Sequence, residues 1–459
     1  MEKTSLKKND ETVLEITDMN ALGSGVGKYE GMAVFVPFTA VGDVIRCRIV
    51  KVCKNYAYGI IAGIEKASPR REDRGCGVYS KCGGCCFRHI SYEEEARIKE
   101  KAVRDAFSRV GGFSEIPFDE FIPCPEHDRY RNKAQLPVAE ENGHLICGFY
   151  SKRSHRVAKC TDCLLAPEIY SRILCTLLEM LEKKGISAYD EITGKGILRH
   201  IFLRRGYHTG EIMLCFVTSA ECAVLRDIAR DIISSFGEIV SVLMNINPDR
   251  TNVILGKKTV LLAGREYMTD IMCGVKVRLS LHSFYQVNTA AAELLYRKAY
   301  EYAALTGEEE VLDLYCGAGT IGLSMAKGAK KLTGVEIIPD AVENARFNAA
   351  ENGIEAEFLC ADAGAAAAAY AAKGAHPHVI VTDPPRKGCD TDTLDAILKM
   401  SPERIVMVSC DVSTAARDIR YLADRGYSLD KVSAADMYAG TAHVEAVALL
   451  SKSKKPSIT

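Results

Sequence analysis

The feature that most constrains the fold is a regular alternation of strand-like and helix-like segments from about residue 289 onward. The apolar, strand-like runs are 309–315, 331–336, 357–360, 379–382 and 404–409. Parallel strands need a crossover connection, and a helix is its usual form, so this alternation is typical of a parallel sheet covered by helices. The sequence therefore predicts a Rossmann-like α/β domain over residues 271–455.

A glycine-rich loop follows the first of these strands. Gly317-x-Gly319-x-x-Gly322 lies between the strand 309–315 and a predicted helix. Glycines at these positions allow a tight turn and a close approach of the backbone to a ligand at the helix N-terminus. By itself the pattern is compatible with NAD, flavin or S-adenosyl-L-methionine (SAM).

Acidic residues end the next strands. Glu336 and Asp362 follow the second and third strands, and Asp383-Pro384-Pro385 follows the fourth. The carboxyl ends of parallel strands meet at one edge, so these side chains are expected to line one crevice, with Glu336 placed to bind ribose hydroxyls. Asp-Pro-Pro is typical of methyltransferases that act on nucleobases, which favours SAM. The alternative is that Glu336 and Asp362 are solvated strand ends.

A cysteine follows the fifth strand. Cys410 is expected to open into the crevice, where the N-terminus of the next helix favours its thiolate and Asp411 opposes it. A thiolate that adds to C6 of uracil makes C5 nucleophilic enough to attack a methyl sulfonium, and a base must then remove the C5 proton. Glu445 enters a final strand expected to pair beside the Cys410 strand. Taken alone, each residue has a structural alternative: a buried cysteine and an exposed strand carboxylate.

Five motifs together resemble the TrmA/RumA-type family of RNA (uracil-5-)-methyltransferases. They are Phe284-Tyr285-Gln286-Val287-Asn288, Asp313-Leu314-Tyr315-Cys316-Gly317-x-Gly319, Asp383-Pro384-Pro385-Arg386-x-Gly388, Ser409-Cys410-Asp411 and His443-Val444-Glu445. The resemblance implies that Cys410 is the nucleophile and Glu445 the proton acceptor. It also implies a SAM site; its members here are Gln286, Tyr315, Gly317, Thr320, Glu336, Asp362 and Asp383. Thr320 stands where some relatives have Asn, and Ala439-Gly440 lacks the proline common before His-Val-Glu.

A cysteine cluster lies near the N-terminal third. Cys76-x5-Cys82-x2-Cys85 supplies three thiolates, and Cys160 or Cys163 is available as the fourth. Four thiolates suit either Zn²⁺ or a [4Fe-4S] cluster, so the spacing leaves both open. The ribosomal-RNA branch of the family is similar here, which implies a [4Fe-4S] cluster with Cys163 as the fourth ligand. Its role would be structural or RNA-contacting, because the uracil chemistry needs no electrons.

Two further segments precede the α/β domain. Residues 8–67 alternate apolar and polar positions with glycine-rich turns, which predicts a small OB-like barrel and resembles the RNA-binding TRAM domain. Residues 68–270 predict a mixed α+β domain that carries the cysteine cluster. Its predicted strands are 133–138, 198–204, 211–217 and 239–245, with helices from Ser91 to Gly111 and over 167–184. Basic clusters at 130–133, 152–156 and 199–205 predict a surface that follows RNA phosphates.

Composition limits the class of protein. The net charge of -1 excludes a uniformly basic nucleic-acid binder. The polar N-terminus and the lack of an apolar run of about 18 residues predict a cytoplasmic protein without a membrane span, and a monomer is expected.

The cysteine cluster favours 23S rRNA over tRNA as the substrate. A tRNA methyltransferase and a non-catalytic RNA-binding or ribosome-assembly protein are the alternatives; a cytosine-C5 enzyme would place a cysteine beside Asp-Pro-Pro.

Overall fold

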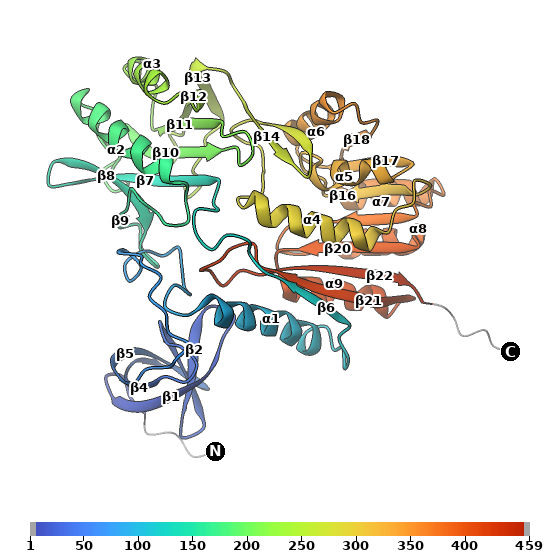
Figure 1. Cartoon of the computed structure of the whole chain (residues 1–459), viewed down its shortest axis with the longest axis horizontal. Coiled ribbons are helices and arrows are strands. Elements are labelled where there is room, and N and C mark those ends of the chain that lie inside the picture. Colours follow the sequence, from blue (N-terminus) through green and yellow to red (C-terminus); the bar gives the residue numbers. More distant parts are fainter. Residues whose placement is uncertain (1–5, 454–459) are drawn as a thin grey trace.

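The structure is a computed structural model that describes residues 6–453. A small barrel, a central sheet with two helices on it and a larger α/β unit follow one another along the chain (Figure 1). Residues 454 and 455 of the predicted C-terminal domain lie outside the described part. Within that part, no helix combines the length and apolar character needed to cross a membrane.

The N-terminal segment forms a closed five-stranded barrel, as predicted. Its strands are β1 (Glu11–Met19), β2 (Ser24–Tyr29), β3 (Met32–Pro37), β4 (Val44–Val52) and β5 (Tyr56–Lys66). Alternate residues such as Leu14, Ile16, Val34 and Val36 fill the interior. This period of two is the pattern that a barrel strand requires, since successive side chains point to opposite faces.

The central part is built on a seven-stranded sheet of order β13-β12-β11-β10-β7-β8-β9. Its strands are β7 (Lys133–Glu141), β8 (His144–Tyr150), β9 (Val157–Lys159), β10 (Leu198–Arg205), β11 (Ile212–Thr218), β12 (Ile239–Ile246) and β13 (Lys258–Gly264). Helices α2 (Glu168–Lys183) and α3 (Leu225–Ser235) share one hydrophobic core with this sheet. All four predicted strands and the helix at 167–184 are confirmed.

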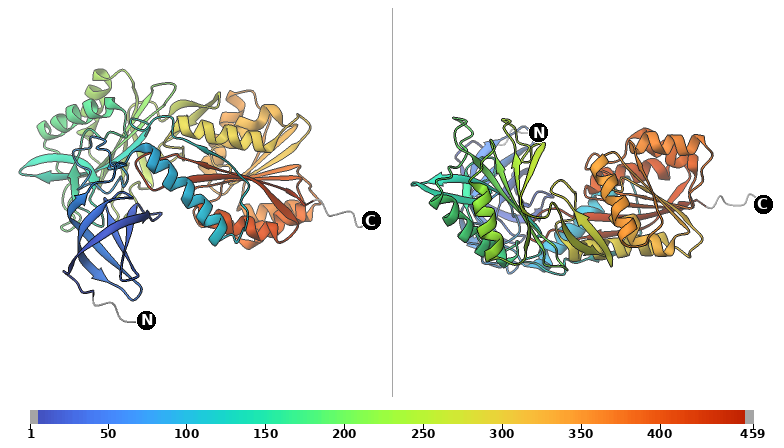
Figure 2. Two further views of the ribbon diagram at one scale, coloured as in Figure 1. Left: turned by 60° about the horizontal axis from the view of Figure 1, so that its bottom comes forward. Right: turned by 90° about the horizontal axis from the view of Figure 1, so that it is seen from above.

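The C-terminal part is an eight-stranded sheet of order β18-β17-β16-β19-β20-β22-β21-β6. Its strands are β16 (Glu310–Leu314), β17 (Lys331–Glu336), β18 (Glu357–Cys360), β19 (Val379–Thr382), β20 (Arg404–Ser409), β21 (Tyr427–Ala435), β22 (Glu445–Lys452) and β6 (Phe118–Ile122). Strands β16 to β20 are parallel, as predicted, whereas β22 runs antiparallel to both of its neighbours. Helices lie on both faces (Figure 2). They are α4 (Thr289–Ala303), α5 (Thr320–Met325), α6 (Pro339–Glu351), α7 (Ala363–Ala372), α8 (Thr391–Met400) and α9 (Val412–Ala423).

Two elements from much earlier in the chain complete this unit. Strand β6 pairs in parallel with β21 at the edge of the sheet. Helix α1 (Tyr92–Arg109), capped by the Ser91 side chain as predicted, places Val103 and Phe107 in the same core as the sheet. The hairpin of β14 (Met268–Met272) and β15 (Val275–Leu279) connects the central sheet to α4.

Candidate active site

The glycine-rich loop has the conformation that a ligand-binding turn requires. Gly317 and Gly319 both have positive φ, at +55° and +81°, and Gly319 immediately precedes α5. Tyr315 also has a positive φ of +66°, which costs a residue with a Cβ about 1–2 kcal/mol. A Cβ added to Gly317 would meet no atom within 4 Å, so there is space beside this glycine.

Carboxylates surround the loop. Asp313 Oδ2 accepts a hydrogen bond from Gly322 N at 2.9 Å, while Glu336 accepts from Gly317 N at 3.1 Å. Burial raises the pKa of Asp313 to about 8 and that of Asp383 to about 7. Asp313 Oδ1 has no partner among the described residues. Buried acids that face each other disfavour their ionised forms, so this crevice favours a ligand with positive charge.

The other predicted cofactor residues lie at the ends of neighbouring elements. Gln286 is buried, and its backbone oxygen accepts from Asn132 Nδ2 at 2.8 Å. Thr320 Oγ1 lies 3.4 Å from the Tyr296 hydroxyl, and the Tyr315 hydroxyl lies 3.4 Å from Thr393 Oγ1. Asp362 has a local task, since its side chain caps α7 by accepting from Ala365 N at 3.1 Å. That these residues bind SAM stays a prediction.

Cys410 directly follows β20 and Glu445 begins β22, and these two strands are paired, as predicted. Ser409 pairs with Ala446 between β20 and β22, which puts Cys410 next to Glu445 at the same end of the sheet. Burial, and then the negative charge of Asp383, raises the pKa of Glu445 to about 8. Burial and the charge of Glu445 also raise the pKa of the Cys410 thiol, while Arg386 lowers it.

The helix that follows Cys410 begins at an acidic cap. Asp411 caps α9, and its carboxylate accepts from Ser413 N at 3.1 Å and from Thr414 N at 3.0 Å. The first free amides of the helix are therefore engaged by Asp411, and the pKa of Cys410 is raised. Arg386, a member of the Asp-Pro-Pro-Arg motif, and a backbone hydrogen bond at Cys410 lower the pKa of the thiol and oppose this rise.

One neighbour of Glu445 escaped the sequence analysis. The hydroxyl of Tyr438 donates a hydrogen bond to Glu445 Oε1 at 3.4 Å. Tyr438 lies in the loop between β21 and β22, seven residues before Glu445. The available signal was its place shortly before the His443-Val444-Glu445 motif. Because Tyr438 lies in a loop, no strand or helix periodicity marks it as a residue that faces Glu445.

The predicted cluster cysteines surround one cavity of about 260 Å³. Its lining includes Cys76, Cys82, Cys85, Cys160 and Cys163, but not Cys86. Within residues 6–453, no three His, Cys, Asp or Glu side chains are grouped as ligands of one metal ion. The structure thus brings the four predicted ligands to the wall of a common space.

The predicted basic surface needs a correction. Arg204 is buried and donates to Ser280 O and Ser283 O, each at 2.9 Å. Arg199 is buried too, and its guanidinium donates to two backbone carbonyls of the loop after β12. His200 and Tyr130 are also buried. A buried guanidinium cannot reach a phosphate, so part of what the sequence suggested as RNA contact is internal support.

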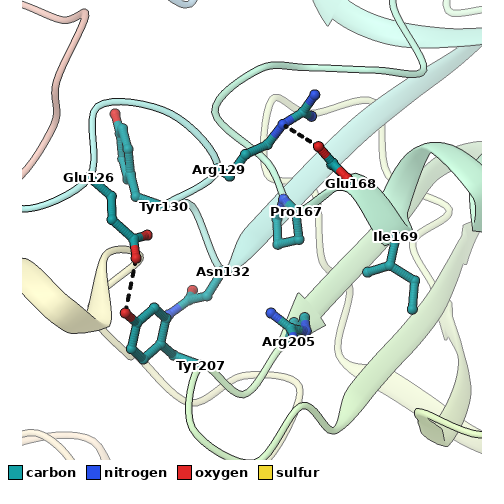
Figure 3. Close-up of a pocket in the computed structure, with 9 residues that line it drawn as sticks. All are labelled: Glu126, Arg129, Tyr130, Asn132, Pro167, Glu168, Ile169, Arg205 and Tyr207. Atoms are coloured by element: carbon teal, nitrogen blue, oxygen red, sulfur yellow. Dashed lines mark hydrogen bonds and ion pairs between the residues drawn. The ribbon is translucent and has the colours of Figure 1, made fainter.

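Accessible basic side chains remain in two places. Residues 152–156 form an exposed loop with three basic side chains and a histidine. Arg129, Arg205 and Tyr207 line a second cavity, of about 390 Å³. In Figure 3 the Arg129 side chain reaches towards Glu168, and it also donates to Asp162. The acids of this cavity are engaged, because Glu126 accepts from the Tyr207 hydroxyl at 3.0 Å and Glu168 pairs with Arg129 at 3.9 Å.

Comparisons with known proteins agree with this geometry. The family model of tRNA (uracil-5-)-methyltransferases matches residues 256–453, and the TRAM domain model matches residues 9–62. A Bacillus cereus protein described as an uncharacterized RNA methyltransferase is 42% identical over 452 residues, 98% of each chain. The chain belongs to the TrmA/RumA-type family of RNA (uracil-5-)-methyltransferases. A Listeria monocytogenes relative with the same description is 42% identical over 98% of this chain and 99% of its own.

A solved structure of the family has the same architecture. The tRNA (uracil-54, C5)-methyltransferase of Pyrococcus abyssi, in complex with S-adenosyl-L-homocysteine, matches with a TM-score of 0.76 and 28% identity. The match covers 95% of this chain and 98% of that one. This RNA (uracil-5-)-methyltransferase is thus a SAM-dependent enzyme with a TRAM barrel and a SAM methyltransferase fold.

Proposed function

We propose that this protein methylates C5 of a uridine in RNA through a covalent bond between Cys410 and C6, and that Glu445 then removes the C5 proton. The observation that supports this mechanism is the pairing of β20 with β22, which brings the thiol and the carboxylate together beside Asp383. A non-catalytic RNA-binding role would give no reason to place a half-buried thiol beside a buried carboxylate.

The two groups have complementary tasks. The Cys410 thiolate adds to C6, and the electrons of the C5–C6 double bond make C5 nucleophilic. SAM supplies the electrophilic methyl group on a positively charged sulfur, and such a charge near Asp383 and Glu445 favours the ionised forms that burial disfavours. Glu445 then takes the proton from C5, the double bond re-forms, and Cys410 leaves C6.

The residues around the glycine-rich loop fit such a ligand. Among the described residues, Asp313 Oδ1 is buried without a partner, Asp383 lies partly buried beyond the end of β19, and the space beside Gly317 is open. We propose that Glu336 receives the ribose hydroxyls, and that Gln286, Tyr315, Thr320 and Asp362 complete the site.

Two variants test the chemistry. RNA labelled with tritium at uridine C5 should lose tritium with the wild type. Cys410→Ser should neither form an adduct nor release tritium, and Glu445→Gln should transfer the methyl group and accumulate a protein–RNA adduct on a denaturing gel. Cys360→Ser, an exposed cysteine that ends β18 in the same sheet, is the matched control and should behave as wild type. Tritium release by Cys410→Ser would refute the covalent mechanism.

We further propose that Cys76, Cys82, Cys85 and Cys163 bind a [4Fe-4S] cluster. A single zinc ion needs four sulfurs about 2.3 Å from one point. In a cluster, each thiolate binds a different iron, so the thiolates surround a larger volume. The cysteines line a cavity of about 260 Å³, and this larger volume supports the cluster.

Metal analysis distinguishes an iron-sulfur cluster from a zinc ion. Protein purified without oxygen should contain iron and sulfide with broad visible absorption. Cys163→Ser should lose the iron, whereas Cys160→Ser, which changes another lining residue, should keep it. One zinc per chain and no iron would overturn the proposal.

The substrate we propose is 23S rRNA, and tRNA is the alternative. The cysteine-lined cavity supports the rRNA branch, whereas the Pyrococcus abyssi structure is that of a tRNA enzyme. The purified enzyme should be given equal amounts of 23S rRNA and total tRNA, and 5-methyluridine in each should be measured by mass spectrometry. Methylation of tRNA alone would reject 23S rRNA. We expect a cytoplasmic monomer.

The outer face of the barrel supports contact with single-stranded RNA. Phe35, Tyr56 and Tyr58 form a cluster with ring centroids 5.5–5.9 Å apart, and both tyrosines are 38% exposed. The exposed Lys51 pairs in register with Tyr58. Aromatic rings beside lysines bind unstacked bases and the backbone between them.

Affinity measurements test this surface. Replacing both tyrosines by alanine should weaken RNA binding by about 10-fold or more, since stacking contributes roughly 1–3 kcal/mol per base. Ile64→Ala, which changes another exposed side chain of β5, is the control. Unchanged affinity in the double variant would exclude the aromatic cluster from RNA binding.

A further inference from the structure

Hydrogen bonds hold the backbone of the loop between β21 and β22 on both sides of Tyr438. Tyr438 N donates to Asp436 Oδ1 at 2.9 Å, and its carbonyl accepts from Lys99 Nζ at 3.1 Å. Asn288 Nδ2, just before α4, donates to Met437 O at 3.1 Å. The ring is therefore presented from a backbone that has little freedom to move.

The residues after Tyr438 are held by two further parts of the chain. Tyr130 donates to Ala439 O at 2.8 Å. Gly440 N donates to Glu95 Oε1 at 2.6 Å, and its carbonyl accepts from the amides of Cys86 and Phe87 at 2.9 and 3.0 Å. Helix α1, the segment with Cys86 and Phe87, and the central part thus all contact the loop between β21 and β22, which leads directly into Glu445.

We propose that Tyr438 is a positioning residue for Glu445, whose carboxylate it holds towards the proton on C5 through its hydroxyl. The inference rests on the proposed function. In the step concerned, the C5–H bond breaks and the proton passes to Glu445. The electron pair of that bond re-forms C5=C6, and the C6–S bond breaks to return the thiolate of Cys410. Tyr438 gains and loses nothing in this exchange; it keeps Oε1 in one place.

The charges around Glu445 explain why such a donor matters. The groups that face the carboxylate are Asp383, Cys410, Arg386, Tyr296 and Tyr438. Asp383 raises the pKa of Glu445, whereas the Tyr438 hydrogen bond and Arg386 lower it. Burial raises the pKa of Tyr438 itself, so the phenol keeps its proton and remains a donor. Donation to the ionised carboxylate therefore favours the form that can accept a proton.

Tyr438→Phe removes only the hydroxyl and tests the proposal in single turnovers with C5-tritiated RNA. The adduct should form at close to the wild-type rate, but its decay and the release of tritium should slow about 3- to 10-fold at pH 7. The pH at which decay is half-maximal should rise by about half to one unit, because one pKa unit corresponds to a tenfold change. KM for RNA should stay within about twofold.

Tyr302→Phe is the matched control. Tyr302 is a buried tyrosine whose hydroxyl contacts a carboxylate, Asp119 Oδ2, at 3.0 Å. It lies near the C-terminal end of α4, whereas Asn288, which contacts the loop, precedes the N-terminal end. The variant should leave both rates and the pH dependence of decay unchanged. Thermal melting of both variants should confirm that they fold.

The outcomes separate the inference from the function on which it depends. If Glu445→Gln traps the adduct but Tyr438→Phe decays with the wild-type rate and pH dependence, Tyr438 is not a positioning residue and the function stands. If adduct formation slows in Tyr438→Phe while decay is unchanged, the hydroxyl acts on the thiol and the proposal is overturned. If no variant forms an adduct and the wild type releases no tritium, the proposed function itself fails.

Discussion

Lys99 should be one of the most sensitive positions in the chain. Its ammonium is 1% exposed and lies 2.7 Å from Glu95 Oε1 and 2.7 Å from Asp436 Oδ1. Arg74 supplies a second positive charge to Glu95 at 2.8 Å. The four side chains form a neutral buried cluster that connects α1 to the loop before Glu445. Lys99→Met would leave one uncompensated negative charge in this cluster.

The size of the effect follows from that imbalance. Removing one partner of a buried ion pair costs about 3–5 kcal/mol, because the other charge stays desolvated. For a unit of roughly 200 residues this corresponds to a fall in Tm of roughly 10 °C. Lys101→Met on the same helix is the control. Lys101 is partly exposed and pairs with Asp105 at 2.8 Å, so its loss should cost under about 1 kcal/mol.

A double variant tests the reasoning more sharply than either single one. Asp436→Asn alone would leave one excess positive charge, whereas Lys99→Met with Asp436→Asn leaves the neutral pair of Arg74 and Glu95. The double variant should therefore melt above both single variants, as differential scanning calorimetry can measure. If the losses in Tm of the two single variants simply add, or if Lys99→Met melts within about 1 °C of Lys101→Met, the reasoning is refuted: the neutrality of the buried cluster does not stabilise the loop before Glu445.

Three further predictions concern pH, RNA and the cofactor. Because Glu445 must be ionised to accept the C5 proton and its pKa is raised to about 8, the rate of tritium release from C5 should rise with pH up to about that value; a flat profile from about pH 6 to 9 would contradict this assignment. Arg153→Ala, at an exposed site, should reduce by about one the slope of the logarithm of RNA affinity against the logarithm of salt concentration. Arg204→Met should leave that slope unchanged and lower Tm, since Arg204 is buried. Asp362→Asn should weaken SAM binding, measured by calorimetry, with little loss of stability, because Asn also caps helices well. If Asp362→Ala and Asp362→Asn lose the same SAM affinity, the charge of Asp362 is what binds SAM.

The sequence predicted the parts of the site that local patterns describe. Parallel strands ending in polar residues are visible from the chain itself, so the crevice and the pairing of Cys410 with Glu445 could be derived. Contacts between distant segments could not. Lys99 and Asp436 are 337 residues apart, and no periodicity links them. Likewise, Arg204 counts as a basic residue in the sequence, although its partners are backbone carbonyls that only the fold brings near.

The edge strand β6 bears on how the chain is made. A ribosome releases residues 118–122 about 300 residues before β21, with which they pair. During synthesis β6 therefore stays unpaired. It can join the edge of the sheet only after β21 has left the ribosome. A fragment limited to residues 256–453 would leave β21 as an open edge able to pair with other copies. The catalytic half is therefore an assembly of the first and last parts of the chain, and should aggregate when it is expressed without its N-terminal segments.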